Sequence, residues 1–194
     1  MSRENKRTTG INGLDQALEG GFPNGTTVLA MGSAVSGTDL LARQFWQSEG
    51  EEGTYLMLDA EVQPGMVDGR GLTADEFITK LNGQKLVIDS LSSFILKFGI
   101  DSGIKCILSA RDIAVTRQAN VVFTFYPELH PRVEEILVMR AVDIVLELKE
   151  VIFMNEIERQ LAVHKISGMA VPRRLIPFLI TEKGIELSTT SRVV

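Results

Sequence analysis

Short apolar runs alternate with amphipathic stretches along most of the chain. The apolar runs are hydrophobic on both faces and predict buried strands over 26–31, 54–59, 85–89, 121–125 and 143–148. Between these runs, apolar positions recur at helical spacing and predict helices over 39–48, 73–81, 102–118 and 130–141. This alternation is typical of an α/β fold, in which a mainly parallel, twisted sheet is covered by helices on both faces.

From Val151 onward, strand patterns follow one another without helices between them. They are V-I-F-M, R-Q-L-A-V-H-K-I and F-L-I-T-E-K-G-I-E-L, and a turn is expected at Asn155 and Glu156. Consecutive strands of this kind usually pair antiparallel. We therefore expect antiparallel strands to extend one edge of the sheet.

Composition agrees with one globular domain. The 194 residues are 44% hydrophobic and 23% charged, which is enough apolar material to bury a core without metals or disulfides. Residues 1–9 are polar and predict a flexible arm, after which Asn12 is expected to cap a short helix. No repeat, low-complexity tract or linker divides the sequence, so a single domain over 1–194 is expected.

Charge and cysteine content exclude several classes of protein. A formal net charge of −5 disfavours binding to nucleic acid or to an anionic membrane, because both call for clustered Lys and Arg. Cys106 has no partner for an intrachain disulfide, and no apolar run has the length of a membrane span or of a signal peptide. His130 and His164 lack neighbours at metal-ligand spacing, so no metal site is expected. These features predict a cytoplasmic protein.

A glycine-rich loop separates the first predicted strand from the next helix. Its sequence is M-G-S-A-V-S-G-T-D-L, and Gly32 and Gly37 have the spacing of a phosphate-binding loop. The two positions after Gly37, however, hold Thr38 and Asp39. A working loop of this kind carries Lys and then Ser or Thr there, to bind phosphate and magnesium.

Three segments resemble the KaiC/RadA-like branch of the RecA-type P-loop ATPases. They are T-T-G-I-N-G-L-D-Q-A-L-E-G-G-F-P-N-G-T-T-V-L-A-M-G, which resembles the family's opening, K-L-V-I-D-S-L-S-S, which resembles its Walker B strand, and R-Q-L-A-V-H-K-I-S-G, which resembles a late strand ending in Lys-x-Arg-Gly. The resemblance covers nearly the whole chain and implies a RecA-like P-loop fold. It assigns a nucleotide site to Gly32, Ser33, Ser36, Gly37, Thr38, Asp39 and Asp89.

The departures from the family pattern point to lost chemistry. Thr38 removes the cation at the phosphates and Asp39 adds a negative charge, which costs about 4 kcal/mol for a carboxylate about 4 Å from a phosphate. No lysine occurs between Lys6 and Lys80, and Arg43 is expected to point away from the loop. We therefore predict no cofactor beyond weakly bound ATP or ADP with magnesium.

Two further family elements are incomplete. The family carries paired acids after its second strand to activate water, and here Glu61 is followed by Val62. The family's Lys-x-Arg element reaches the nucleotide of a neighbouring subunit, and here Lys165 remains but Ser167 replaces the arginine. Glu61 and Lys165 are thus relic candidates, and no catalytic residue is predicted.

Each candidate also has a structural explanation. Asp39 suits a helix N-cap, Asp89 suits hydrogen bonds to a neighbouring loop, Glu61 suits a solvated loop, and Lys165 suits a cap at a strand edge. Arg173 and Arg174 form a small basic spot that is expected in a solvated loop.

Four functions stay open. The leading one is a non-catalytic module that acts through protein association, as a homo-oligomer or as the partner of an intact KaiC/RadA-like ATPase. A nucleotide-binding protein with little or no hydrolysis, an active ATPase with a displaced cation and a DNA-recombination paralogue are the alternatives. The last is disfavoured because the segment that would face DNA carries Glu147, Glu150, Glu156 and Glu158, which repel phosphates.

Overall fold

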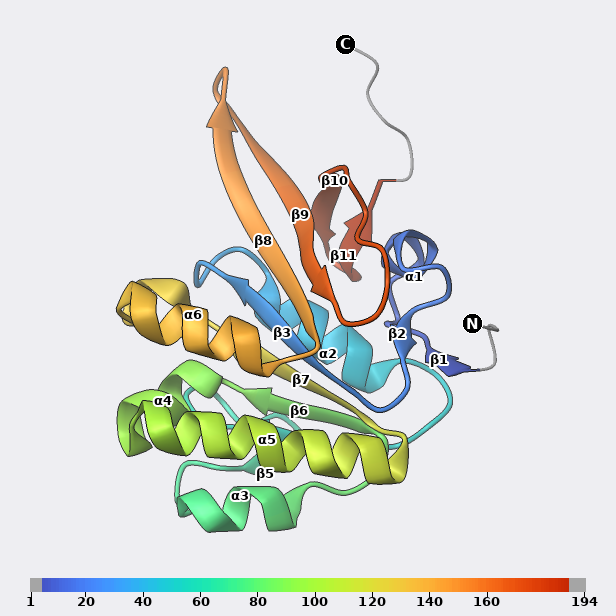
Figure 1. The fold of residues 1–194 in the computed structure, drawn as a ribbon. Coiled ribbons are helices and arrows are strands. Elements are labelled where there is room, and N and C mark those ends of the chain that lie inside the picture. The colour runs from blue at the N-terminus through green and yellow to red at the C-terminus, as the bar shows by residue number, and fades with distance from the viewer. Residues whose placement is uncertain (1–4, 189–194) are drawn as a thin grey trace.

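The computed structural model describes residues 5–188 as a central sheet with helices on both sides (Figure 1). The strands of the sheet are β3 (Thr26–Gly32), β4 (Tyr55–Met57), β5 (Val67–Asp68), β6 (Lys85–Asp89), β7 (Asn120–Phe125), β8 (Ile144–Phe153), β9 (Glu156–Ile166), β10 (Ile176–Thr181) and β11 (Gly184–Leu187). Their spatial order is β11-β10-β9-β8-β3-β7-β6-β4-β5. A separate ribbon pairs β1 (Lys6–Arg7) with β2 (Phe22–Pro23).

The predicted α/β class is confirmed. All pairings from β5 to β8 are parallel, whereas β8, β9, β10 and β11 pair antiparallel in succession. The turn between β8 and β9 consists of Met154 and Asn155, one residue earlier than predicted, because Glu156 already pairs with Phe153.

Helices cover the sheet on both faces, and the sheet separates the hydrophobic core into two halves. The helices are α1 (Asn12–Ala17), α2 (Thr38–Gln47), α3 (Ala74–Lys80), α4 (Leu91–Phe98), α5 (Ile100–Arg117), α6 (Arg132–Ala141) and the 3-10 turn η2 (Pro127–Leu129). Val28 and Ala30 of β3 pack with α1 and α2, while Leu29 and Met31 pack on the side of α3 to α6. A strand buried on both faces is mainly apolar, which explains the nearly continuous apolar runs.

Two elements were missed by the sequence prediction. The residues of α4 were not assigned to a helix, and α5 begins at Ile100 rather than Ser102, directly after Gly99 with φ 83°. The two-residue strand β5 is too short to produce an alternating pattern. No helix in residues 5–188 combines the length and the apolar character that a membrane span needs.

The predicted flexible arm is wrong from Lys6 onward, and residues 1–4 lie outside the described part. Lys6 and Arg7 form β1, and Arg7 and Thr9 are buried. Asn12 is the first residue of α1 rather than its cap, and the carboxylate of Asp15 instead accepts hydrogen bonds from the Thr9 amide at 2.7 Å and hydroxyl at 2.6 Å. The polar sequence gave no sign that Arg7 and Thr9 are buried, because both side chains form hydrogen bonds with other polar groups inside the protein.

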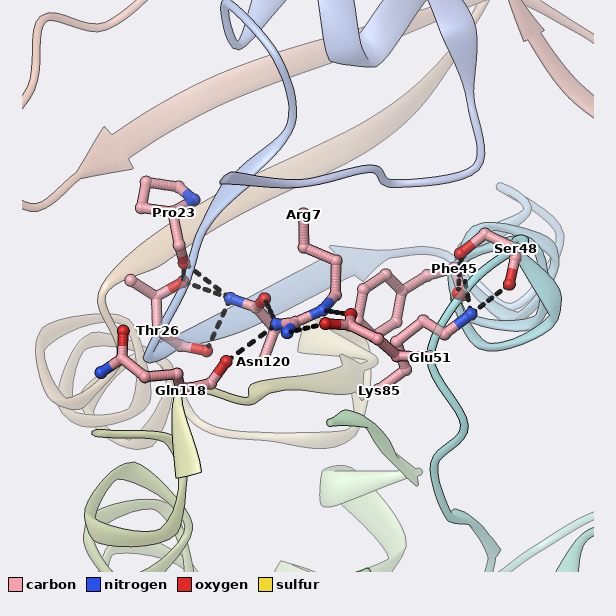
Figure 2. A network of polar contacts seen from close by, with 9 residues as sticks. All are labelled: Arg7, Pro23, Thr26, Phe45, Ser48, Glu51, Lys85, Gln118 and Asn120. Atoms are coloured by element: carbon pink, nitrogen blue, oxygen red, sulfur yellow. Dashed lines mark hydrogen bonds and ion pairs between the residues drawn. The ribbon is translucent and has the colours of Figure 1, made fainter. Parts of the chain in front are cut away.

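A polar network connects the amino-terminal ribbon to the body of the protein (Figure 2). The Arg7 guanidinium donates to Asn120 Oδ1 at 2.5 Å, to the Gln118 carbonyl at 3.1 Å and to Glu51 Oε1 at 3.0 Å. Nearby, buried Lys85 donates to the Ser48 carbonyl and hydroxyl. Lys85 and Asn120 are the first residues of β6 and β7, so the network lies at the amino ends of the parallel strands.

Candidate functional site

The glycine-rich loop lies at the carboxyl end of β3, at the edge of the sheet opposite the Arg7 network. A Cβ atom at Gly32 would lie 2.4 Å from Ser36 Oγ and 2.5 Å from the Leu148 carbonyl oxygen, so only glycine fits. Gly37 has φ 93° and occupies the N-cap position of α2. Both glycines are therefore required by the backbone of this strand–loop–helix unit.

The loop is closed by its own serines. The Ser36 side chain is buried, and its hydroxyl donates to the Ser33 carbonyl at 2.7 Å. The Ser36 amide donates to the same carbonyl at 3.1 Å. Ser33 Oγ is buried and has no hydrogen-bond partner within residues 5–188.

Thr38, which stands where a P-loop lysine would be, points into the protein. Its side chain is buried and hydrogen-bonded to the Tyr126 hydroxyl. Tyr126 follows β7, and its backbone amide donates to Ser92 Oγ at 2.9 Å. Burial and the nearby Asp89 carboxylate raise the pKa of Tyr126 to about 12, so this tyrosine stays protonated at neutral pH.

Asp39 forms an ion pair with Arg43 one helical turn further along α2. Two expectations are corrected here, because Asp39 is the second residue of α2 and not its cap, and Arg43 bends back toward the loop. The i,i+4 spacing brings the two side chains together. Since the pair is only half-exposed, it neutralises the negative charge that Asp39 would otherwise present to the cavity.

Asp89 is buried at the end of β6, and both of its oxygens are in use. One accepts a hydrogen bond from the Tyr55 hydroxyl and the other from the Thr124 hydroxyl. Burial raises the pKa of Asp89 even though these bonds oppose the rise, and burial also raises the pKa of Tyr55. The partners lie on the neighbouring strands β4 and β7, not on a loop as expected.

A cavity of about 240 Å³ opens beside the loop, at the carboxyl ends of β4 and β6. Its lining residues are Ala34, Asp39, Arg43, Met57, Asp59, Ala60, Glu61, Gln63, Met66, Asp89 and Tyr126. Glu61 is exposed on its wall. Within residues 5–188, no group of three or more His, Cys, Asp and Glu side chains is arranged to hold a metal ion.

Asp59 and Tyr126 are cavity residues that the sequence analysis did not select. Asp59 accepts hydrogen bonds from the hydroxyls of Ser90 at 2.6 Å and Ser93 at 2.5 Å. Both residues follow a buried strand, and the carboxyl ends of parallel strands are where ligands usually bind in such folds. That position in the predicted topology was the signal that could have identified them.

Lys165 and Ser167 lie away from the cavity. The Lys165 ammonium donates to the carbonyls of Arg140 at 3.2 Å and Met139 at 3.3 Å, so it caps the carboxyl end of α6 rather than a strand edge. The Ser167 hydroxyl donates to the Asp143 carbonyl at 3.1 Å. Within this chain, neither side chain is directed outward toward a neighbour's nucleotide.

The remaining polar candidates have local partners or face solvent. His130 Nδ1 lies 2.9 Å from Glu134 and its ring stacks on Phe125, while His164 Nε2 lies 2.5 Å from Glu147. Arg173 and Arg174 are exposed in the connection before β10, as expected for a solvated loop.

Comparison with known proteins identifies the fold. Residues 7–66 match the family model of the KaiC ATPase. A solved structure, the KaiC-like protein PH0186 from the hyperthermophilic archaeon Pyrococcus horikoshii OT3, matches 94% of this chain and 98% of its own with a TM-score of 0.77, at 23% sequence identity. The fold is KaiC-like. The resemblance predicted from the sequence is thereby confirmed.

The two comparisons support different parts of the KaiC-like chain. The family match contains the glycine-rich loop, Asp39, Asp59 and Glu61, whereas Asp89 and Lys165 lie beyond its end at Met66. The structural match extends over nearly the whole chain and shows the fold alone at this identity. No curated protein matches the sequence.

Proposed function

We propose that this KaiC-like protein does not hydrolyse ATP and acts through protein association, as a regulator or as the partner of an active family ATPase. The observation that carries the proposal is that the key side chains of the site form hydrogen bonds or ion pairs with neighbouring side chains of the same chain. Thr38 is bonded to Tyr126, Asp39 to Arg43, and Asp89 to both Tyr55 and Thr124.

These contacts oppose the binding of Mg-ATP. While Asp39 and Arg43 are paired, the pair offers a phosphate beside α2 no net positive charge. Arg43 could attract the phosphate only by leaving Asp39, and the freed carboxylate would then repel it, at a cost of about 4 kcal/mol for a like-charge contact at about 4 Å and an effective dielectric of about 20. A magnesium ion at Asp89 would have to share carboxylate oxygens that already accept hydrogen bonds from the hydroxyls of Tyr55 and Thr124 in a buried site.

Exposed apolar side chains support the association part of the proposal. The hairpin of β8 and β9 exposes Ile152 and Met154, each by 82%, and α6 exposes Val133 by 62%. Large apolar side chains that are exposed together on one element often mark a contact with another protein.

A second candidate function is nucleotide binding without turnover. The backbone of the loop favours it, because Gly32 and Gly37 keep the conformation that lets amides at a helix N-terminus approach a phosphate. Arg43 also lines the cavity and would be the cation available to such a ligand.

Calorimetry with Mg-ATP, together with a phosphate-release assay, separates these functions. We expect no binding heat and no turnover from the wild-type chain. The double variant Thr38→Lys/Asp39→Thr restores the cation and the magnesium-binding hydroxyl, so it should bind in the micromolar range, with hydrolysis still weak or absent. Glu49→Lys, an exposed change of equal formal charge beyond the far end of α2, serves as the matched control and should not bind.

Each contrary result has a definite meaning. Equally tight binding by the wild type and the double variant would favour nucleotide binding over a purely associative role. ATP turnover by the wild type that Asp89→Ala abolishes would overturn the non-catalytic proposal. Binding by the Glu49→Lys control would show that net charge, rather than the loop, governs affinity.

A further inference from the structure

The cavity beside the glycine-rich loop has an acidic rim. Asp59 and Glu61 are exposed on the segment after β4 that borders it, and neither carboxylate has an ion pair within residues 5–188. Among the described lining residues, Arg43 is the one basic side chain, and it is already paired with Asp39. The described lining therefore has no unpaired cation to balance the charge of the rim.

The Asp59 carboxylate is held in place as a hydrogen-bond acceptor. The hydroxyls of Ser90 and Ser93 both donate to its Oδ2 atom, at 2.6 Å and 2.5 Å. Its Oδ1 atom has no hydrogen-bond partner within the described part of the chain. Because two donors on one oxygen fix the direction of the carboxylate, little side-chain freedom is lost when a ligand donates to the other oxygen.

The wall of the same cavity is partly apolar. Met57 is 6% exposed and belongs to the hydrophobic core, and Met66 is partly buried against that core. Tyr126 also lines the cavity, and its hydroxyl is hydrogen-bonded to Thr38. Thioether side chains adapt to methylene chains, and aromatic rings attract cations through their faces. The wall therefore suits a ligand with an apolar body and a positive charge.

The electrostatic potential inside the cavity is negative. Four carboxyl groups and one guanidinium line it in the described part of the chain. Burial is the main cause of the raised pKa of both Asp89 and Tyr126, and the Asp59 carboxylate raises each pKa further. A negative potential of this kind attracts cations and repels phosphate and carboxylate groups.

An organic cation fits this lining better than a metal ion does. Calcium and magnesium bind through clusters of oxygen ligands, and residues 5–188 contain no group of acidic, His and Cys side chains arranged to hold a metal. An ammonium group needs acceptors for three N–H bonds, and the carbon chain attached to it can use the apolar wall. The cavity volume of about 240 Å³ lies below the range of about 300–1,000 Å³ that holds drug-sized ligands, so the ligand is small.

We propose that this cavity binds a small aliphatic amine. The ammonium group donates to Asp59 Oδ1 and to the Glu61 carboxylate, and the methylene chain packs against Met57 and Met66. The proposal goes beyond the associative function and does not depend on it, because an amine can bind here whether or not the chain has a protein partner.

Calorimetry with three compounds, each built on four carbons, separates the charge of the ligand from its shape. Putrescine carries two ammonium groups, butanediol carries two hydroxyls and succinate carries two carboxylates. We expect the wild-type protein at low salt, where exposed charges are least screened, to bind putrescine and to give no heat with butanediol or succinate. Binding of succinate in place of putrescine, or no heat from putrescine, would overturn the proposal.

The variant Asp59→Asn/Glu61→Gln removes both charges of the rim. The Asn amide oxygen can still accept from the hydroxyls of Ser90 and Ser93, so the variant should fold like the wild type by circular dichroism. We expect its affinity for putrescine to fall by about tenfold or more. Wild-type affinity in this variant would contradict the assigned contacts.

A matched control tests whether overall charge explains the effect. The variant Glu49→Gln/Glu52→Gln makes the same change in formal charge on two exposed residues before β4, at the end of that strand opposite the cavity. Its affinity for putrescine should stay within about twofold of the wild type. A control that weakens binding as much as the rim variant would show that net charge, rather than the cavity, attracts putrescine.

The variant Arg43→Gln gives a change whose sign depends on the ligand. It keeps a good helix former and leaves the Asp39 carboxylate unpaired beside the cavity. For an amine, affinity should rise by about threefold, because a repelling cation is lost and a carboxylate is freed. For an anion, the same change would lower affinity. Putrescine binding that is unchanged or weaker in Arg43→Gln would overturn the proposal.

Discussion

The Asp89 carboxylate links three strands of the sheet. Its two oxygens join β6 to the neighbouring strands through Tyr55 and Thr124. The side chain is 2% exposed, and burial raises its pKa above the ordinary value of 3.8. The charged form is therefore less stable in the folded chain than in the unfolded chain.

Asp89→Asn should stabilise the protein at neutral pH. The amide oxygen can accept from one hydroxyl and the amide NH₂ can donate to the other, without the buried charge, so we expect a gain on the order of 1 kcal/mol, or about 2–4 °C in melting temperature. The wild type loses stability as pH rises from 3.8 through the raised pKa, so the gain should appear above pH 3.8 and vanish below it. Thermal melts across pH measure this.

The control for this experiment is Asp112→Asn, an exposed change on α5 that should leave the melting temperature unchanged. A loss of stability in Asp89→Asn at neutral pH would show that the hydroxyls of Tyr55 and Thr124 require the charged acceptor.

Single residues were predictable where the requirement is local. Gly32 and Gly37 follow from the loop spacing, because a backbone turn depends on neighbours in sequence. The Asp39–Arg43 pair has the i,i+4 signature and could have been found, but the direction in which Arg43 bends depends on its surroundings. The Thr38–Tyr126 contact joins distant segments and left no pattern in the sequence.

Among the elements, the β8–β9 hairpin extends furthest beyond the packed core. Its inner half includes buried Leu146 and Val163, whereas residues 151–157 are exposed. Glu150 and Arg159 form a pair at 3.0 Å where the exposed part begins. The folded body therefore does not depend on the tip.

Replacing residues 151–158 by Asn-Gly should leave the fold intact. The two-residue turn would join Glu150 directly to Arg159 in the existing register. We expect the free energy of unfolding to change by less than about 1 kcal/mol in urea titrations at low protein concentration, where association adds nothing. A loss of several kcal/mol would mean that residues 151–158 pack against the body.

Elements were predictable in proportion to their burial. The five parallel strands predicted from apolar runs are present as β3, β4, β6, β7 and β8, because strands buried on both faces are mainly apolar. Helix α4 was missed because L-S-S-F-I-L-K-F is short and follows its strand after Ser90 alone. Boundaries near Gly99 could not be fixed without the packing of α4 on α5.

For the molecule as a whole, the Arg7 network closes the edge opposite the candidate site. It connects the amino-terminal ribbon to the segment after α2 and to the start of β7 through Glu51 and Asn120. The Arg7 side chain is 4% exposed, so its partners would lose hydrogen bonds that water cannot readily replace. Nothing in a polar amino terminus predicts this, because the partners lie far away in sequence.

Arg7→Ala should destabilise the protein by about 2–3 kcal/mol in urea titrations, because it leaves buried acceptors unpaired. The exposed Arg70→Ala, which breaks a surface pair with Asp68, is the control and should stay close to wild type. Arg7 lowers the pKa of Glu51, mainly through their hydrogen bond, so this stabilisation is present above pH 4.5 and declines as pH falls through the lowered pKa. An Arg7→Ala protein as stable as Arg70→Ala would contradict the role of the network.

In evolutionary terms, the Asp39–Arg43 ion pair would make the proposed loss of nucleotide chemistry difficult to reverse. Losing Asp39 alone leaves Arg43 without its partner beside the cavity, and Thr38→Lys alone places a second cation at a buried position next to Tyr126. Each single step back carries a cost before any phosphate affinity returns, larger for a lysine at the buried position 38 and smaller for the partly exposed Arg43. Under the proposed function, selection would remove such intermediates and keep a lineage in the associative role.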